Sequence, residues 1–355
     1  MQTALPRFTD TPNFYSDLKT RVNQYFERSQ KDPTGNWRLF SKAIILIVAH
    51  IAFYTLLVFF KPHAWLAIIY CVILGVLTAA IGFNVMHDGA HGSFSKYKWL
   101  NKLAAFSLNI LGGNDYMWNI KHNVIHHGFT NIDGVDDDIN AGPLVRMCTT
   151  QKRRWFHQFQ HLYVGFLYAM LYLLWMFVLD YGKYFSGKVA GVSIKRMTVW
   201  EHISFWGGKA GNLIIFIVVP ILMVGPIDAL IGFGVFVGIT GFLISLVFQL
   251  AHAVEHTHFP VADEQGKIKN EWAIHQIQTT ANFATTNPVV TWFCGGLNFQ
   301  IEHHLFPKIS HIHYPKISAI VRQTCAEYGI QYVEYPRVHT AVLSHFRFLR
   351  EMGRK

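Results

Sequence analysis

The chain has 355 residues, of which 51% are hydrophobic and only 15% are charged. Its formal net charge of +10 does not indicate a nucleic-acid-binding protein, because the basic residues form no dense tract and no recognisable nucleic-acid motif. The four cysteines form no CxxC pair, so we expect them to be reduced and to form no disulfide framework. Low charge together with long apolar runs indicates a single membrane-embedded unit.

The first 41 residues are polar and charged and lack the pattern of a cleavable signal peptide. Within them, Phe14, Leu18, Val22 and Phe26 recur every four residues, which predicts an amphipathic helix. This helix can lie on a membrane surface or pack on the protein itself, and the pattern leaves both open. We therefore divide the chain into a cytoplasmic, interfacial N-terminal region, residues 1–41, and a membrane domain, residues 42–355.

Long apolar runs follow at residues 43–60, 64–85, 210–224 and 227–250. At ~1.5 Å per residue the first two each reach roughly 27 Å or more, which is enough to cross a bilayer. Only the tripeptide KPH separates the first two runs, and Gly225-Pro226 separates the last two, so each pair predicts a hairpin. A further apolar run at residues 159–179 is ambiguous.

Histidine is unusually frequent, with 20 residues, and nine of them fall in four short clusters. The clusters are HDGAH (His87, His91), HNVIHH (His122, His126, His127), HAVEH (His252, His256) and QIEHH (Gln300, His303, His304). Spacings of three to five residues place the members of a cluster on one helix face or its edge. A single histidine in such a place is more often a hydrogen-bonded structural residue. Packing does not explain four such clusters, which together predict metal binding.

These ligands indicate more than one metal ion. Nine histidines and Gln300 are too many for one zinc ion, whose sites usually have four ligands. Imidazole suits zinc, copper, iron and nickel, so the ligand type alone leaves copper open. The set matches two six-coordinate ions with room for oxygen or water. We expect two irons, because oxygen chemistry on hydrocarbon at a lipid boundary needs a strong oxidant.

The clusters and the charges together predict the topology. If all clusters meet at one site, the chain crosses the membrane an even number of times between them. The hairpin at 210–250 supplies two crossings, so the run at 159–179 should lie in the interface. The loops at 61–63 and 224–228 carry one basic residue, Lys61, so the positive-inside rule makes the other regions and both termini cytoplasmic.

We predict an all-α integral membrane protein with four transmembrane helices in two hairpins. A cytoplasmic helical cap, residues 86–209 and 251–355, would hold the metals.

The motifs resemble those of the membrane fatty-acid desaturase family. The first two clusters are similar to its HxxxH and HxxxHH boxes. GGLNFQIEHHLFP, residues 295–307, resembles its third box in the variant with glutamine in place of the first histidine, which is associated with front-end and linoleoyl-type acyl desaturases. The resemblance covers residues 40–350 and extends to the flanking stretches MHDGAHGSFS, HHGFTNIDGVDDDI and TTANF.

The resemblance implies iron ligands at His87, His91, His122, His126, His127, His256, His303 and His304, with His252 and Gln300 as further candidates. The family uses a histidine at the end of the last span, four residues after a polar residue that holds a metal-bound water, and His256 after His252 fits that pattern. Gln300 departs from the all-histidine form of the box. It can bind through its amide oxygen, hold a water, or serve only as a spacer.

The resemblance also implies the reaction and its partners. The di-iron centre would use O2 as co-substrate and introduce a cis double bond into a long-chain acyl group carried by coenzyme A or a lipid. A narrow apolar tunnel would lead the acyl chain to the metals. The sequence contains no HPGG motif of a cytochrome-b5-type domain, so we expect a separate electron donor, a ferredoxin or a cytochrome b5-like protein, with its reductase. We expect a bacterial inner membrane rather than the endoplasmic reticulum.

Residues outside the ligand set are expected to support it. Four acids are candidates to orient the imidazoles, and solvated or helix-capping carboxylates are the simpler alternative. These acids are Asp88, Asp137, Glu255 and Glu302. Trp118 and Asn131 are candidates to line the substrate tunnel.

Other functions fit parts of the pattern. The same di-iron site suits an acyl hydroxylase, epoxygenase or acetylenase, and the motifs barely separate these from a desaturase. HAVEH also matches the inverted zinc-protease motif HxxEH, with Glu255 as the base, but this leaves the other clusters unexplained. A haem-binding bundle would need histidine pairs inside the spans, and only His50 lies well inside one.

Overall fold

The computed structural model describes residues 5–9 and 13–355, and helices make up most of the described chain. The first half contains α1 (Phe14–Ser29), α2 (Trp37–Phe59), α3 (Ala64–Ile81), η1 (Gly82–Met86), α4 (His87–His91), α5 (Lys98–Ile110), α6 (Asp115–Asn119), η2 (Ile120–His126), α7 (His127–Phe129), η3 (Asp137–Ile139), η4 (Trp155–Phe159), α8 (Gln160–Leu174), η5 (Trp175–Leu179) and α9 (Asp180–Ser186). The second half contains α10 (Val199–Leu213), η6 (Ile214–Val218), α11 (Val219–Val224), α12 (Pro226–His252), α13 (Trp272–Gln278), α14 (Pro288–Phe293), α15 (Gln300–Leu305), η7 (His311–His313), α16 (Tyr314–Glu327) and α17 (Val338–Arg354).

Two-residue strands pair segments that lie far apart in the chain. β1 (Arg7–Phe8) runs parallel to β4 (Lys267–Ile268), and β5 (Asn282–Phe283) runs parallel to β6 (Glu334–Tyr335). β2 (Lys188–Val189) and β3 (Val192–Ser193) form an antiparallel turn before α10. The strands are too short to build a sheet, so helix packing determines the fold.

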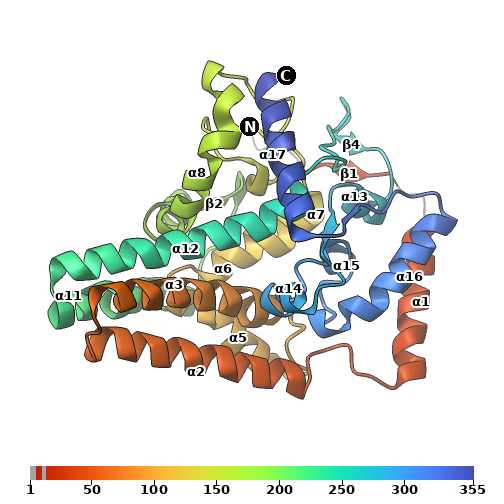
Figure 1. Ribbon diagram of the computed structural model, residues 1–355. Coiled ribbons are helices and arrows are strands. Elements are labelled where there is room, and N and C mark those ends of the chain that lie inside the picture. The colour runs from red at the N-terminus through yellow and green to blue at the C-terminus, as the bar shows by residue number, and fades with distance from the viewer. Residues whose placement is uncertain (1–4, 10–12) are drawn as a thin grey trace.

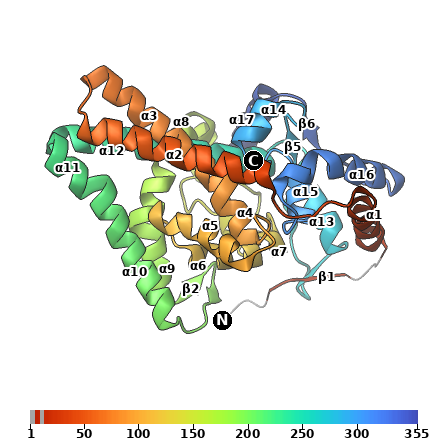
Figure 2. The same ribbon diagram turned by 90° about the horizontal axis from the view of Figure 1, so that it is seen from below.

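Both predicted hairpins are present. α2 and α3 form the first, and α11 and α12 form the second, with Gly225 at a φ of 93° in the turn before Pro226. The turns of both hairpins lie on the left in Figures 1 and 2, while α1, α13, α15 and α16 gather on the opposite side. The apolar helices therefore share one end that is remote from the C-terminal segments.

Among residues 5–9 and 13–355, five helical stretches are long and apolar enough to cross a membrane, one more than the sequence predicted. They are Trp37–Phe59, Ala64–His91, Trp155–Ser186, Val199–Val224 and Pro226–His252. The additional stretch contains residues 159–179, which the sequence assigned to the interface. It qualifies because η4, α8, η5 and α9 follow one another without a break and form 32 helical residues. The chain is a multi-pass membrane protein of the all-α class.

The additional stretch is not aligned with α2, α3 and α12. In Figure 1, α8 stands steeply across α12, whereas α2 and α3 run alongside α12. The backbones of α8 and α12 meet at Gly241, where an added Cβ would lie 2.7 Å from the Ala169 carbonyl oxygen and 2.8 Å from that of Tyr168. Only a residue without a side chain permits this approach.

The N-terminal helix packs on the protein. The side chains of Phe14, Leu18 and Val22 in α1 are at most 2% exposed and join a core with Ile317 and Val321 of α16. Of the two possibilities that the sequence left open, the structure therefore contains the helix packed on the protein itself.

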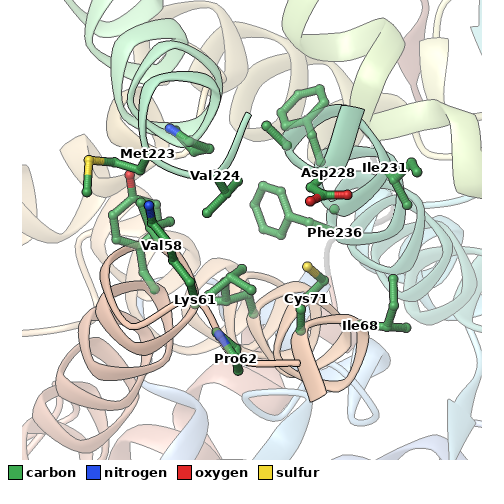
Figure 3. Close-up of a pocket in the computed structure, with 18 of the residues that line it drawn as sticks. Val58, Lys61, Pro62, Ile68, Cys71, Met223, Val224, Asp228, Ile231 and Phe236 are labelled. Carbon is green, nitrogen blue, oxygen red and sulfur yellow. The ribbon is translucent and has the colours of Figure 1, made fainter. Parts of the chain in front are cut away.

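A cavity of about 440 Å³ lies between the turns of the two hairpins, at the end remote from the histidine clusters. Figure 3 shows its lining, which is mainly apolar but includes Lys61 and Asp228. Cys71 also lines it, and all four cysteines, Cys71, Cys148, Cys294 and Cys325, are buried and free.

The close approach of α8 and α12 generates a first prediction. Gly241→Ala should destabilise the protein by about 1–3 kcal/mol, because the new methyl group overlaps the α8 backbone. Gly238→Ala on the same helix is the matched control, since its Cβ would meet no atom within 4 Å. We expect it to be neutral or slightly stabilising, because alanine favours helix over glycine. Thermal unfolding of both variants in detergent measures the difference, and equal midpoints would contradict the packing described.

Candidate metal centre

Three of the four histidine clusters are placed by short helical segments. His87 and His91 belong to α4, which continues α3 through the π-helical turn η1. His122 and His126 belong to the π-helical η2, and His127 begins α7. A π-helix hydrogen-bonds residues five apart and so aligns such residues on one face. His122 and His127 are five apart, and their Nε2 atoms lie 3.3 Å from each other.

The remaining ligand candidates come from the second half of the chain. His252 is the last residue of α12, and His303 and His304 lie in the short helix α15. Gly295 and Gly296, just before α15, have φ angles of 57° and 72°. A Cβ at Gly295 would lie 2.4 Å from the Phe83 carbonyl oxygen, so this glycine lets the segment pass close to η1.

Among the described residues, the histidine side chains converge in two groups whose nitrogen atoms can hold a metal ion, and a further group joins His122 and His126 to Asp138. The first group is His87, His91, His122 and His303, and the second is His126, His252 and His304. In each group the possible ligand atoms all lie within 4.8 Å of one another. His127 lies between the groups, with its ring stacked on His304 at a centroid distance of 4.3 Å.

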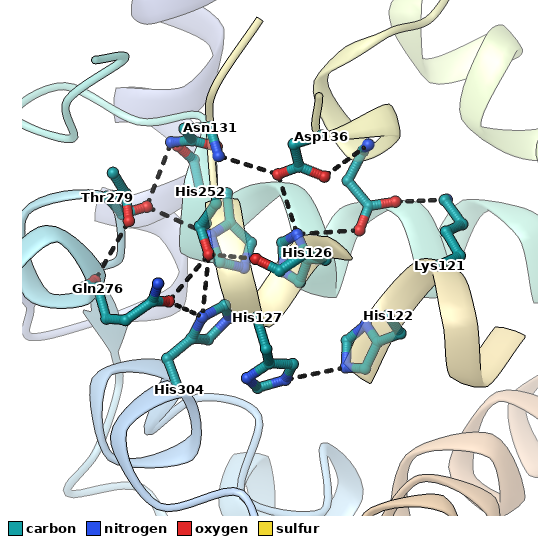
Figure 4. Close-up of polar contacts among 12 residues, drawn as sticks. Lys121, His122, His126, His127, Asn131, Asp136, His252, Gln276, Thr279 and His304 are labelled. Carbon is teal, nitrogen blue, oxygen red and sulfur yellow. Dashed lines mark hydrogen bonds and ion pairs between the residues drawn. The ribbon is translucent and has the colours of Figure 1, made fainter. Parts of the chain in front are cut away.

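In the second group every Nδ1 atom has an oxygen acceptor (Figure 4). His304 Nδ1 lies 2.7 Å from Gln276 Oε1, and His252 Nδ1 lies 3.3 Å from the Thr279 carbonyl oxygen. An acceptor at Nδ1 requires the proton there, which leaves Nε2 of the same ring with a free lone pair. The Nε2 lone pairs of the second group can therefore accept a metal ion or a hydrogen bond, and the possible ligand atoms of the group lie within 4.8 Å of one another.

His126 has the strongest such partners. Its Nδ1 donates to Asp136 Oδ2 at 3.0 Å and lies 3.2 Å from Asp138 Oδ2. Burial alone would lower the pKa of His126, but the two carboxylates outweigh it and raise the pKa. Asp138 is in turn paired with Lys121 at 2.5 Å. Carboxylates behind an imidazole fix its orientation and increase its basicity as a metal ligand.

The site passes a direct test of fit for metal ions. Nε2 of His91, His126 and His303 is buried without a hydrogen-bond partner among the described residues. Such buried polar atoms are costly unless something binds them. Burial also holds the pKa values of four imidazoles well below the usual range, so they are uncharged and have lone pairs to offer. These four are His122, His127, His303 and His304.

Gln300 lies at the edge of the second group. Its Nε2 is 3.0 Å from Nε2 of His252 and 3.4 Å from Nε2 of His304, while its Oε1 is buried without a partner among the described residues. The amide nitrogen thus donates to a lone pair that a metal ion would otherwise use. Rotation of the amide by half a turn would present Oε1 to the same place.

His256 lies outside both groups. The sequence placed it on one helix face with His252, but α12 ends at His252, so the four-residue spacing does not continue on a helix. His256 has a φ of 74°, and its side chain is exposed. The inverted zinc-protease arrangement needs both histidines of HAVEH on one ion, so the structure also removes that alternative.

None of the four acids predicted to orient the imidazoles contacts a member of the two histidine groups through a hydrogen bond that the structure describes. Asp88 accepts from Ser310 at 2.9 Å and contacts His311 Nδ1 at 3.0 Å. Glu302 accepts hydrogen bonds from Asn282 and Tyr332, each at 2.8 Å. Asp137 lines a cavity, and Glu255 lies at the surface beside α17.

The two tunnel candidates differ in position. Trp118 stacks on His122 at a centroid distance of 4.3 Å and lines a cavity of about 240 Å³ that reaches His87 and His122. Asn131 does not line this cavity. Its Nδ2 donates to the carbonyl oxygens of His252, His258 and Thr279, so it ties the loop after α7 to the end of α12.

Sequence reasoning missed several residues that hold the imidazoles. Asp136 and Asp138 flank the predicted Asp137 in a run of three acids, and only the turn of the chain decides which of them face His126. Gln276, and Tyr314 at 3.1 Å from His303 Nδ1, come from segments with no recognisable spacing to the histidines. The only sign of this role in the sequence is that Gln276 and Tyr314 are hydrogen-bonding residues beside apolar runs.

Glu302 generates a prediction about pH. Burial, only partly offset by hydrogen bonds from Asn282 and Tyr332, raises the pKa of Glu302 to about 7 from an ordinary value of 4.5. A raised carboxyl pKa gives stability that is complete below pH 4.5 and is lost as the pH rises to about 7. Glu302→Gln cannot ionise, so it should match the wild type at low pH and exceed its stability above pH 7, by at most about 3 kcal/mol. Paired unfolding curves at pH 5 and 8 measure this, and an unchanged difference between the proteins would contradict it.

Comparison with known proteins agrees with this geometry. Residues 63–336 match the family model described as fatty acid desaturase. The chain is 35% identical to an sn-1 linoleoyl-lipid 6-desaturase of Arthrospira platensis over 98% of this chain and 94% of the relative. It is also 35% identical to an sn-1 linoleoyl-lipid 6-desaturase of Synechocystis sp., over 98% of each chain.

A third relative is also named as a lipid desaturase. The acyl-lipid (8-3)-desaturase of Physcomitrium patens is 35% identical over 97% of this chain and 72% of the relative. These matches cover the histidine clusters, the apolar helices and the segments that hold the imidazoles. The resemblance seen in the sequence is therefore confirmed, and the chain belongs to the fatty acid desaturase family.

Proposed function

We propose that this desaturase introduces a cis double bond into the acyl chain of a membrane lipid, with two iron ions held by its histidines. The observation that carries the proposal is the set of buried Nε2 atoms without a partner among the described residues. Two of them, in His91 and His303, belong to the group whose other members, His87 and His122, line a mainly apolar cavity. An acyl chain in that cavity would lie next to the ions. The substrate class follows the relatives, which are named as lipid desaturases.

The two groups divide the ligands between two ions. One ion takes His87, His91, His122 and His303, and the other takes His126, His252 and His304. His127 lies between them and completes one of the two sets. Gln300 joins the second ion through Oε1 after its amide rotates, or holds a water there. Imidazole and amide oxygen ligands suit iron.

When bound and reduced, the irons supply the O2 chemistry that removes two hydrogens from neighbouring methylenes. The chain's own residues decide where this happens. Met86, Trp118 and Phe248 bring apolar surface to the cavity beside His87 and His122, which excludes water and holds the acyl chain against the site. Because methylenes are chemically alike, position alone selects the carbon.

We further propose four membrane crossings with both termini in the cytoplasm and the cap on that side. The rings of His126 and His252 lie with their centroids 4.7 Å apart, so both must be on the same side of the membrane. The chain therefore crosses an even number of times between them, and two crossings are supplied by Val199–Val224 and Pro226–His252. Trp155–Ser186 then lies within one leaflet, which fits the steep angle of α8 in Figure 1.

Electrons come, in this proposal, from a separate acidic redox protein. A basic surface surrounds the end of α17 and η4, where the Arg153 Nε donates to the Gly353 carbonyl oxygen at 3.1 Å. Its exposed members are Lys152, Arg153, Arg154, Arg347, Arg350, Arg354 and Lys355. Such a surface steers an acidic partner toward the protein. It also lies near the metal ligands, because Glu255, which lies beside these arginines, is three residues after His252.

The ligand assignment generates a prediction with a matched control. His303→Ala should lower the iron content of the purified protein and abolish desaturation, because a buried Nε2 of the first group is lost. His256→Ala should keep both, because this side chain is exposed and lies outside the groups. Iron is measured by elemental analysis per chain, and product double bonds by mass spectrometry of lipids from an expressing host.

Two outcomes would overturn the assignment. Full desaturation by His303→Ala would exclude the first group as the metal site. Loss of iron from His256→Ala, with a wild-type unfolding temperature, would restore the ligand set inferred from the sequence.

The topology is tested with single cysteines, since the native cysteines are all buried. Thr149→Cys and Ser193→Cys lie on either side of Trp155–Ser186, and His63→Cys lies in the turn between α2 and α3. A membrane-impermeant maleimide should label Thr149→Cys and Ser193→Cys from the same side, and His63→Cys from the other. Labelling of Thr149→Cys and Ser193→Cys from opposite sides would mean that Trp155–Ser186 crosses the membrane.

A further inference from the structure

The cavity between the turns of the two hairpins is separate from the metal site. Cys71 lines this cavity, and His87 lies farther along the same helical stretch, Ala64–His91. At ~1.5 Å per residue, Cys71 is roughly 24 Å from His87 along that helix. No described residue lines both this cavity and the cavity beside His87. A molecule held between the turns would therefore not occupy the place of the substrate.

This cavity has the size and the lining of a ligand site. Its volume of about 440 Å³ lies within the roughly 300–1,000 Å³ of small-molecule sites. Most of its lining is aliphatic or aromatic, including Phe216, Phe233 and Phe236. Ile68 of α3 and Ile231 of α12 also line it and are 39% and 53% exposed, so an apolar chain can enter from the bilayer. A chain that fills the space adds the contacts that its walls lack.

Two charged side chains border this apolar space (Figure 3). They are Lys61, in the turn between α2 and α3, and Asp228, in the first turn of α12. Neither side chain forms a hydrogen bond or an ion pair with a residue that the structure describes. The positive end of the α12 dipole favours a carboxylate at Asp228, but it provides no partner for Lys61.

Lys61 occupies a position that membrane topology and backbone geometry both disfavour. In the proposed topology the turns at 61–63 and 224–228 lie outside the cytoplasm, and Lys61 is their one lysine or arginine. Its φ of 47° is in the left-handed region, which costs energy for a residue with a side chain. A charged residue in such a conformation at the rim of a cavity points to a function of its side chain.

We propose that this cavity binds a phospholipid with a primary ammonium in its head group, such as a phosphatidylethanolamine. One acyl chain fills the apolar space, the phosphate pairs with Lys61, and the ammonium pairs with Asp228. A primary ammonium donates hydrogen bonds to a carboxylate, whereas a quaternary ammonium cannot and a glycerol head has no positive charge. The bound lipid holds the two hairpins together at the end remote from the histidines.

The test measures lipid binding to the purified full-length protein after its own lipid has been removed in detergent. The probes are dioleoyl lipids with phosphoethanolamine, phosphocholine or phosphoglycerol heads, and dioleoylglycerol, which lacks a phosphate. Native mass spectrometry counts the bound lipids, and the rise of the unfolding temperature during a lipid titration gives the affinity. We expect the phosphoethanolamine lipid to bind at least about tenfold more tightly than each of the others.

Variants of the two charged residues separate the head-group contacts. Lys61→Met should weaken binding of the phosphoethanolamine lipid by about tenfold. Asp228→Asn should weaken it as well, but should strengthen binding of the phosphoglycerol lipid, because the carboxylate no longer repels an anionic head. A gain of affinity cannot result from misfolding. Lys188→Met and Glu264→Gln, at exposed positions outside the lining, are the controls and should change neither affinity.

A filled cavity distinguishes this site from the substrate cavity. Ala67 belongs to the lining, so Ala67→Phe should occupy the space of the acyl chain and abolish the selective binding of the phosphoethanolamine lipid. It should not lower the unfolding temperature of the lipid-free protein, since filling a cavity adds apolar contacts. Selective binding that persists in Ala67→Phe would place the lipid elsewhere and overturn the proposal.

Further outcomes decide against the proposal or against the proposed function. Equal affinities for the four probes, or wild-type affinities in both Lys61→Met and Asp228→Asn, would overturn the lipid site. A dimer without bound lipid in the mass spectra would mean that a second copy of the chain covers the cavity instead. Double bonds formed in an expressing host are measured separately, so selective lipid binding without any desaturation would contradict the proposed function alone.

Discussion

The structure depends on one constraint, the burial of uncharged imidazoles with their lone pairs directed inward. An imidazole in a dry interior is stable only if both ring nitrogens are satisfied. In the second group, oxygen acceptors from the loop after α7, from α13 and from the backbone near it take the Nδ1 protons. Nε2 of His126, and of His91 and His303 in the first group, is left without a partner among the described residues, and a metal ion is the partner that this arrangement suits.

The same constraint explains the architecture around the site. The histidines come from the ends of two apolar helices and from two short segments, so the cap must fold back onto the hairpins to bring them together. The π-helical turns and the glycines before α15 provide the local geometry, and α8 closes the cavity by packing its backbone against Gly241. The cavity thus joins a charged opening, an apolar passage and the metal ligands in one path.

Some expectations from the sequence were confirmed, and others differ from the arrangement in the structure for identifiable reasons. The family, the desaturase activity and the membrane class were confirmed. They could be predicted because the motifs and the apolar runs consist of neighbouring residues and do not depend on tertiary contacts. His256 lies outside both histidine groups, because the helix that the spacing assumed ends at His252. Asp136 and Asp138, and not the predicted Asp137, contact His126, because successive residues of this run point in different directions.

The sequence by itself determined the family, the histidine-rich clusters and the apolar helices, because each is carried by neighbouring residues within one or two turns. Only the tertiary structure decided which imidazoles share a group, which acid stands behind His126, and that Gln276 and Tyr314 hold His304 and His303. The contacts that hold the imidazoles join residues from 10 to 28 positions apart, whereas each group brings together histidines from both halves of the chain, and Asp88 contacts His311 across 223 positions. Local periodicity contains no information about such pairs, since they form only when the cap packs onto the ends of the membrane helices.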